Sequence, residues 1–434
     1  KVDELIVTDL NFGMYKQDME TAKEIANIQK NYNYPISVDA PAGKNMPKRI
    51  INIASIMKGW SMGGVIQSSD PDVLKAIKRS NISISAYQDL IDFGNKQKAN
   101  RTYTEIILGL PSDTKERHFE SLRLGVEKSV NNLRMHQAML LTGTEMASKR
   151  DREKYGLVTK FRTLPGNVGN YNILNEEHPV AEIEEIVVGS NTLSMNDYVE
   201  CRIMNLIIKT FYNNNIFNEI HSMQRAMGVS PFDCLLYIKD HEEMYTKKVK
   251  KIIESFVTET TEDLFDTREK ANEYVLLPNV INKYINGELG TNELFLHSSL
   301  LFNEFKDISD LIFESVKRVI KQKGLLTPLI ENYLTDLKRF TLMRKNIPLN
   351  NTESVLLGEF EYDFESIHKS EYFLNPNSIS KLKTSIQLKF FHTNKQQEHI
   401  ANQQKLYSNH ALGLGRLLQQ TNLNLVFRSF ERNQ

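Results

Sequence analysis

Polar side chains and glycines lie where three apolar segments in the first third of the chain come to an end. At the first of these ends, Asp9 and Asn11 lie two residues apart and Gly13 follows them. The side-chain oxygens could accept hydrogen bonds from a ligand ammonium group, and a glycine lets a ligand approach the backbone. A simpler interpretation of Asn11-Phe12-Gly13 is a turn in which Asp9 or Asn11 caps the following helix.

The second segment end combines a side-chain amide with a guanidinium group. Gln67 and Ser68 end an apolar segment, and Arg79 follows Gln67 by twelve residues. An amide directed into the site and a guanidinium suit a ligand that carries a carboxylate and hydroxyl groups. An equally good interpretation is an ordinary helix that Asp70 caps and whose C-terminal end Arg79 stabilises.

The third segment has a carboxylate near its start and a glycine at its end. Glu105 precedes the apolar run 106–108, and Gly109-Leu110 closes that run. A carboxylate inside an apolar strand is costly to bury unless it is paired. Glu105 could therefore hold a ribose diol or pair with Arg79, or it could lie at an exposed strand start. Gly109 would let the backbone come close to a ligand.

Other candidate groups give weaker indications. His136 and Gln137 could line the same cavity, although a lone histidine is more often a satisfied core residue than a ligand. Cys201 and Cys234 lie among apolar residues without a spaced companion. We therefore expect reduced, buried thiols in a cytoplasmic protein. The sequence has no zinc-binding spacing, P-loop or Gly-x-Gly-x-x-Gly pattern, so it predicts no metal ligand.

The overall composition excludes some classes of partner. The 54 basic residues balance the 54 acidic ones, which gives no indication of nucleic-acid binding or of binding to an anionic membrane. No apolar run reaches the ~20 residues of a membrane span. The chain has 434 residues, enough for two or three domains with sizeable cores.

Alternating patterns predict the elements that position these residues. Strand-like and helical segments alternate up to about residue 141, which predicts an α/β fold with a parallel sheet and right-handed crossovers. The predicted strands are 4–9, 35–39, 62–67, 103–109 and 133–141. Prolines open two of the intervening helices, at Pro47 and Pro71, and Ser112 or Asp113 is expected to cap the helix 114–128.

Beyond residue 141 the pattern changes. Closely spaced Gly, Pro and Asn residues predict a long ordered loop over 150–180. Residues 194–345 are expected to be mostly helical, and the last part to be a small α+β region with strands at 355–364, 385–392 and 423–430 and a polar helix near 394–419. The predicted regions are 1–145, a barrel-completing extension 146–193, a helical region 194–345, and 346–434.

Taken together and in this order, the segment ends resemble the radical S-adenosylmethionine (radical SAM) superfamily. The similarity covers residues 4–175 and becomes looser to about 212. Asp9 to Gly13 resembles the strand end that holds the methionine amine, Gln67-Ser68 with Arg79 is similar to the family's Gln and Arg twelve residues apart, and 105–111 resembles the strand beside the adenosine. Met139 to Thr144 resembles Leu-Leu-Pro-Gly-Thr, with Thr142 in place of the proline, and 152–157 is similar to members with an upstream cobalamin-binding domain.

This resemblance implies a partial parallel (β/α) barrel that lacks its first strand. It implies an enzyme that, at full length, reductively cleaves S-adenosylmethionine at a [4Fe–4S] cluster to drive radical chemistry on an unknown small-molecule or peptide substrate. An electron donor such as flavodoxin or ferredoxin, and possibly cobalamin in an upstream domain, are implied as well. The implied cofactor-binding residues are Asn11, Phe12, Gly13, Gln67, Ser68, Arg79, Glu105, Gly109 and Leu110.

One departure from the family pattern is serious. The Cys-x-x-x-Cys-x-x-Cys loop that binds the cluster is absent, and Lys1 stands where the second barrel strand should begin. We expect a fragment that starts after this loop and that is inactive as written. The alternatives are a degenerate scaffold or nucleoside-binding protein, and an unrelated α/β-barrel enzyme that acts on a small polar metabolite.

Overall fold

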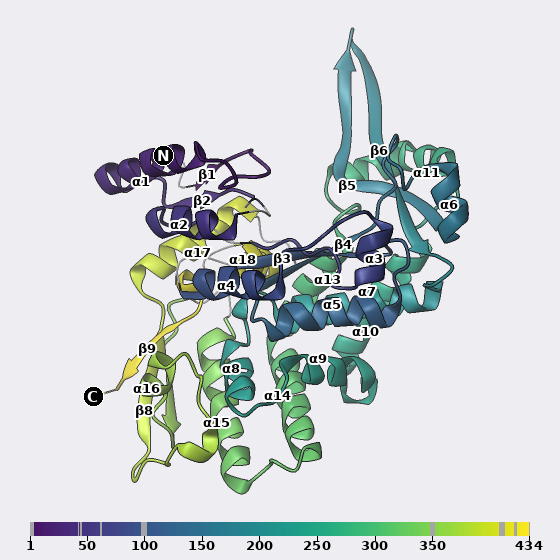
Figure 1. Cartoon of the computed structure of the whole chain (residues 1–434). Coiled ribbons are helices and arrows are strands. Elements are labelled where there is room, and N and C mark those ends of the chain that lie inside the picture. The colour runs from purple at the N-terminus through teal and green to yellow at the C-terminus, as the bar shows by residue number, and fades with distance from the viewer. Residues whose placement is uncertain are drawn as a thin grey trace. The chain divides into compact units, whose positions relative to one another are not determined.

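The structure is a computed structural model that describes residues 4–41, 43, 46–60, 63–96, 102–347, 352–407, 413–420 and 423–433. It is a mixed α/β structure, which confirms the predicted fold class at this level (Figure 1). The chain divides into two compact units. Unit 1 is Lys1–Lys160 with Glu184–Cys201, and unit 2 is Phe161–Ile183 with Arg202–Gln434. The four regions expected from the sequence stay a prediction.

Unit 1 carries parallel pairings that follow the order of the chain. Its short strands are β1 (Glu4–Ile6), β2 (Ser37–Asp39), β3 (Tyr103–Leu108) and β4 (Asn132–Gln137). β1 pairs with β2 and β3 with β4, both in parallel. Trp60 bridges β2 through Val38, and Gly63 and Gln67 bridge β3, again in parallel. Because parallel neighbours need crossover connections, this order is that of successive βα units.

Helices occupy the crossovers, as the alternation predicted. They are α1 (Asp18–Tyr32), α2 (Pro47–Ile56), α3 (Pro71–Ala76), α4 (Ile84–Lys96) and α5 (Lys115–Glu127). Asp70 caps α3 by accepting the N–H groups of Asp72 and Val73. The expected cap of α5 was wrong, because Thr114 caps it instead of Ser112 or Asp113 and accepts the N–H of Arg117.

Two apolar clusters hold these elements together. The first joins α1 and α2 to the first strands and includes Ile25, Val38, Ile50 and Trp60. Trp60 is fully buried, and its indole N–H donates to the Ala40 carbonyl at 2.9 Å. The second cluster lies at the ends of the later strands and consists of Val73, Leu110, Ala138, Leu140 and Val187. Each cluster packs helical residues of unit 1 against its strand segments.

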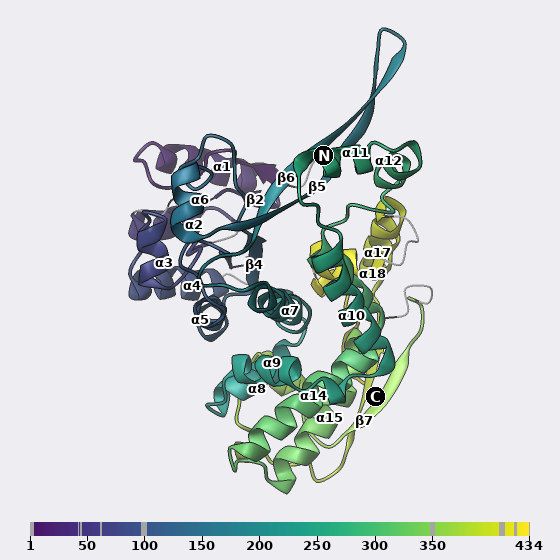
Figure 2. The same ribbon diagram turned by 90° about the vertical axis from the view of Figure 1, so that its right-hand side faces the viewer.

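The prediction of a long ordered loop over 150–180 was wrong. The chain forms α6 (Lys149–Tyr155) and then a hairpin of two long strands, β5 (Val158–Ile173) and β6 (Glu176–Gly189), which both views show (Figures 1 and 2). Leu174 and Asn175 connect the strands, and both have positive φ values. A two-residue turn with two positive φ values is a type I′ turn, usually made by Asn-Gly. Leu-Asn gives no such signal.

Unit 2 is mostly helical, as expected for 194–345. α7 (Met195–Phe211) enters it, followed by α8 (Asn218–Ala226), α9 (Pro231–Asp240), α10 (Lys247–Glu262), α11 (Arg268–Val275), α12 (Pro278–Ile285), α13 (Glu293–Asn303), α14 (Phe305–Gln322) and α15 (Pro328–Lys345). Cys201 and Cys234 are buried and form no disulfide within the described ranges, as predicted. Across the part of the chain that the structure describes, no helix is long and apolar enough to cross a membrane.

The last part of unit 2 is the small α+β region that the sequence predicts. β7 (Leu356–Phe360), β8 (Ile386–Phe391) and β9 (Ser429–Arg432) form an antiparallel sheet in this order. α16 (Phe364–Lys369) follows β7, and the polar segment forms α17 (Asn394–Tyr407) and α18 (Gly413–Gln420). The strand expected over 423–430 was placed too early, because 423–425 is a short 3-10 helix.

Candidate functional site

The first predicted segment end is a tightly bonded turn. The carboxylate of Asp18, in the first turn of α1, accepts the N–H groups of Gly13 at 2.9 Å and Tyr15 at 2.8 Å. Asp9 accepts the N–H of Asn11 at 2.8 Å. α1 begins after Gln17, so neither Asp9 nor Asn11 is its cap.

Phe12 and Gly13 have packing roles in this turn, whereas Asn11 is exposed. Phe12 is buried, and its ring lies edge-on to Trp60 at 5.4 Å between centroids. Gly13 has φ +90°, and a Cβ there would lie 3.0 Å from Cγ1 of Ile50. Of these three predicted residues, Asn11 has the side chain that a ligand could reach from solvent.

Gln67 has an unusual backbone conformation beside β3. Its φ is +56°, in the left-handed region, while its N–H donates to the Glu105 carbonyl at 2.8 Å and its own carbonyl accepts the Ile107 N–H at 2.9 Å. A non-glycine residue in this region costs about 1–2 kcal/mol. Such strain collects at sites where it fixes the direction of a functional side chain. The Gln67 side chain is half-buried.

The polar groups of Ser68, by contrast, are hydrogen-bonded within the fold. It is buried, its Oγ accepts the Asp70 N–H at 3.2 Å, and its carbonyl accepts the Asn81 amide at 2.8 Å. These bonds fix the turn into α3, so they explain Ser68 without a ligand.

Arg79 and Glu105 lie close enough to influence each other. Nη2 of Arg79 donates to the Val65 carbonyl at 2.9 Å, and its buried Nε has no hydrogen-bond partner within the described ranges. Burial lowers the pKa of Arg79, and the charge of Glu105 opposes this effect. The ion-pair partner of Glu105 is Arg134, directly across the β3–β4 register at 3.6 Å. The Glu105 carboxylate is one-third exposed.

Gly109 and Leu110 are held by packing against another segment of unit 1. Gly109 has φ +84°, and a Cβ there would lie 3.2 Å from the Val187 carbonyl oxygen. Leu110 is buried in the second apolar cluster with Val187. The glycine is therefore needed for close approach of β6, whatever binds beside it.

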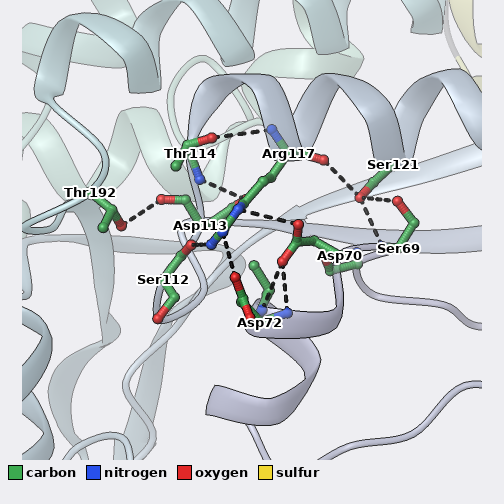
Figure 3. A network of polar contacts seen from close by, with 11 residues as sticks. Ser69, Asp70, Asp72, Ser112, Asp113, Thr114, Arg117, Ser121 and Thr192 are labelled. Carbon is green, nitrogen blue, oxygen red and sulfur yellow. Dashed lines mark hydrogen bonds and ion pairs between the residues drawn. The ribbon is translucent and has the colours of Figure 1, made fainter.

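At this strand end Asp113 has a buried, titratable side chain, and the sequence did not indicate it as a site residue. It is 1% exposed, and its carboxyl oxygens accept the N–H groups of Thr114 at 3.0 Å and Gly109 at 3.3 Å (Figure 3). Burial raises its pKa to about 7, partly opposed by these two N–H groups and by Arg117, and assisted by Asp70. The burial that causes the shift has no signature in the local sequence.

Arg117 ties two strand ends together around Asp113. Its Nε lies 3.2 Å from Asp70, its Nη2 2.7 Å from Asp72, and its Nη1 donates to the Ser112 carbonyl at 2.6 Å (Figure 3). Ser121, one turn further along α5, accepts the N–H of Ser69 at 2.9 Å. The start of α3 and the start of α5 are thus fixed to each other, and so are the ends of the segments that precede them.

The sequence also predicted that His136 and Gln137 could line the cavity. His136 is exposed, and Gln137 donates to the Tyr198 hydroxyl. Glu105 is linked to Gln67 by a backbone hydrogen bond and to Arg79 by the interaction of their charges. A surface pocket of about 650 Å³ lies instead at the starts of α1 and α2, beside Lys16 and Arg49, and none of the predicted residues lines it.

The two cofactors implied by the resemblance fit this chain unequally. The unpartnered Nε of Arg79, the half-buried Gln67 and the partly exposed Glu105 suit the carboxylate, ammonium and hydroxyl groups of S-adenosylmethionine. A [4Fe–4S] cluster needs several thiolates. Cys201 and Cys234 are both buried, and burial raises the pKa of the Cys201 thiol. These cysteines do not fit a cluster.

Comparison with known proteins gives matches in about half of the chain. No family model matches. The cobalamin-dependent radical SAM methyltransferase TokK of Streptomyces tokunonensis is 29% identical over 208 residues, which are 46% of this chain and 29% of TokK. The chain resembles the cobalamin-dependent radical SAM proteins. A second relative agrees: the 2-(S-pantetheinyl)-carbapenam-3-carboxylate methyltransferase of Streptantibioticus cattleyicolor is 28% identical over 212 residues, 46% of this chain and 29% of that protein.

The radical SAM relatives are much longer than the part that matches. The chain spans about three tenths of the length of both curated relatives. Among solved structures, the radical SAM methyltransferase TsrM of Kitasatospora setae, with tryptophan and a SAM analogue bound, is 14% identical, with a TM-score of 0.27 over 40% of this chain and 33% of TsrM. A TM-score this low gives no support for a shared fold.

Proposed function

We propose that this chain is part of a radical SAM methyltransferase and that unit 1 binds S-adenosylmethionine at the carboxyl ends of its parallel strands. The observation that carries the proposal is that Glu105, a partly exposed carboxylate, is linked to Gln67 through a backbone hydrogen bond and to Arg79, with its unpartnered guanidinium nitrogen, through their charges. Both curated relatives are named as methyltransferases, which supports methyl transfer as the reaction class.

Each of these side chains has a role that its chemistry suits. Arg79 would bind the methionine carboxylate through its unpartnered Nε, because a guanidinium N–H forms a charge-assisted hydrogen bond with a carboxylate. Glu105 would accept hydrogen bonds from the ribose hydroxyls. Asn11 and Gln67 would contact the methionine ammonium and the nucleoside through their amides. The turn at Gly109 and Leu110 would border the adenosine, with Phe12, Gly13 and Ser68 supporting the neighbouring turns.

The wider architecture follows the same proposal. The parallel pairings β1–β2, β2–Trp60, Gln67–β3 and β3–β4 would form one side of a (β/α) barrel. Thiolates from outside this chain would hold a [4Fe–4S] cluster, which supplies the electron for reductive cleavage when a donor such as flavodoxin or ferredoxin reduces it. Cobalamin would bind in a further domain, and the substrate is a small molecule or a peptide.

A non-catalytic nucleoside-binding scaffold is the second candidate, and one observation favours it. The two cysteines of this chain do not fit a cluster. A chain of this kind would bind the adenosyl moiety at the same residues and would release no product.

The test uses the chain together with any residues that its gene encodes upstream of Lys1, purified without oxygen. We expect bound iron and release of 5′-deoxyadenosine or S-adenosylhomocysteine after reduction with S-adenosylmethionine. Gln67→Ala and Arg79→Ala should each weaken S-adenosylmethionine binding about ten- to a hundred-fold, because a charge-assisted hydrogen bond contributes about 1.5–3 kcal/mol. Lys75→Ala, on the exposed side of α3, is the control that should bind normally.

The outcomes separate the candidates. A protein that binds S-adenosylmethionine but no iron supports the scaffold and rejects the enzyme. A protein that cleaves S-adenosylmethionine with unchanged affinity in both variants supports the family and rejects the residue assignment.

A further inference from the structure

Unit 2 contains a pocket of about 370 Å³ between α15, α16, α17 and the segment that leads into β9. The side chains lining it include Arg344, Lys369, Gln396, Phe427, Arg428 and Phe430. A volume of this size is within the range of small-molecule sites. All of these residues belong to unit 2, and the pocket is separate from the site described above.

The most unusual group in this pocket is Arg428. Its side chain is 1% exposed, and its Nη1 donates to the carbonyls of Met343 at 2.8 Å and Asn346 at 2.9 Å. Its buried Nε has no hydrogen-bond partner, and no carboxylate among the described residues forms an ion pair with it. Burial accordingly lowers the pKa of Arg428. A buried cation without a counter-ion is costly, and it attracts an anion strongly.

Arg344, whose carbonyl accepts the Arg428 backbone N–H at 3.0 Å, also has an unpartnered guanidinium nitrogen. Its Nη1 lies 3.3 Å from the Tyr372 hydroxyl and 3.8 Å from Glu219, and its buried Nε has no partner within the described ranges. Glu219 is already bound to Lys345 at 2.6 Å. In both guanidinium groups Nη1 bonds to the protein, whereas Nε has no partner within the described ranges. The edge that carries Nε is the one that binds oxyanions side-on.

The charge balance of the pocket wall is positive. Lys369 is exposed at the rim, and the one carboxylate in the wall, Glu365, is bound to Nε of Arg432 at 2.7 Å. The Gln396 amide is already bonded within the fold, since its Nε2 donates to the carbonyls of Asn424 at 2.9 Å and Phe427 at 2.8 Å. We propose that this pocket binds a small molecule through a carboxylate or phosphate group, with Arg344 and Arg428 as the anion-binding residues and Phe427 and Phe430 beside the rest of the ligand.

The experiment titrates the full chain with sodium phosphate and, separately, with sodium acetate at constant ionic strength set with chloride. Saturable binding, followed by calorimetry and by the rise in unfolding temperature, is the expected result. Arg344→Gln should weaken it at least tenfold and Lys369→Gln about two- to threefold. Lys383→Gln, an exposed lysine of unit 2 outside the pocket wall, is the matched control and should bind as the unchanged chain does.

Because Arg428→Gln removes bonds to two backbone carbonyls, it is informative only if circular dichroism shows a folded protein; Arg344→Gln and Lys369→Gln carry the test without it. Binding of phosphate alone would assign a phosphate-bearing ligand. Binding of acetate alone would assign a ligand with a carboxylate. Binding of both anions would mean that the pocket accepts either group. The proposal is overturned if neither anion binds saturably, or if Lys383→Gln weakens binding as much as the two pocket variants do.

Discussion

Asp113 accepts the backbone N–H of Gly109, with 3.3 Å between the amide nitrogen and Oδ2. The same carboxyl group accepts the Thr114 N–H at 3.0 Å, and the Thr192 hydroxyl donates to the Asp113 carbonyl at 2.7 Å. One buried acid therefore joins the end of β3 to the start of α5 and to the segment after β6. The stability of this strand end depends on the protonation state of that acid.

This dependence predicts a fall in stability as pH rises. Burial raises the pKa of Asp113 from 3.8 to about 7, with Asp70 adding to the effect and Arg117 opposing it. Between these pH values the folded protein keeps a proton that the unfolded chain has released. The stabilisation is therefore complete below about pH 4 and is lost as pH rises to about 7. The gap corresponds to about 4 kcal/mol at most.

Asp113→Asn should flatten this pH dependence, because an amide does not titrate. The measurement is the free energy of unfolding in urea between pH 4.5 and 8 for both proteins. Asp72→Asn, which changes an exposed partner of Arg117, is the control and should keep the slope. Parallel curves for the unchanged chain and Asp113→Asn would contradict the assignment.

Gly109→Ala should destabilise unit 1 by about 2–3 kcal/mol. The alanine must adopt φ +84° and place its Cβ 3.2 Å from the Val187 carbonyl oxygen. Gly143→Ala is a matched control, because Gly143 has φ +86° and open space around its Cβ position. It should show only the backbone cost of about 1 kcal/mol. Equal losses in urea denaturation would show that the approach of Val187 is unimportant.

Gln67→Gly should separate stability from binding. Glycine relieves the left-handed strain at φ +56°, so the variant should be up to about 1 kcal/mol more stable, while losing affinity for S-adenosylmethionine. Ser129→Gly relieves a similar strain at φ +58° beyond the C-terminal end of α5, and it should gain stability without any change in binding. Normal affinity in Gln67→Gly would remove Gln67 from the site.

Arg152→Met should destabilise the junction between α6 and β6 by about 1–3 kcal/mol. Arg152 and Glu185 form a two-pronged ion pair at 2.5 and 2.8 Å, and the Glu185 side chain is only 10% exposed. Removing one member of a largely buried pair leaves the other poorly compensated. Lys149→Met removes an exposed pair with Glu153 and should change the free energy of unfolding by less than about 0.5 kcal/mol.

Local patterns were enough to predict most elements but few of the contacts at the site. The stripe Ile203, Leu206, Ile207 and Phe211 predicted α7. All of it is buried except Ile203, which is half-buried, because helical periodicity and burial arise from the same geometry. Pro47 and Pro71 open α2 and α3 as predicted. Signals of this kind lie within one helical turn of the residues whose structure they predict.

The contacts that the sequence did not predict join residues far apart in the chain. Glu105 pairs with Arg134 because of the β3–β4 register, and Gly109 meets Val187 because β6 returns beside the strand ends. The hairpin itself was missed since Leu174 and Asn175 make its turn without an Asn-Gly signal. Asp113 was expected only as a cap, and its role follows from burial by segments that pattern analysis cannot place.

The course of the chain between the two units limits how this protein can be divided. β5 leaves unit 1 after Lys160 and β6 re-enters it at Glu184, before α7 carries the chain into unit 2 again at Arg202. A cut after Cys201 would keep 161–183 but remove Phe265, whose N–H and carbonyl both bond to Phe161 at 2.8 Å. No single break gives two intact halves. Exchange of the helical unit between relatives would therefore need three coordinated crossovers, so these units are expected to be inherited together.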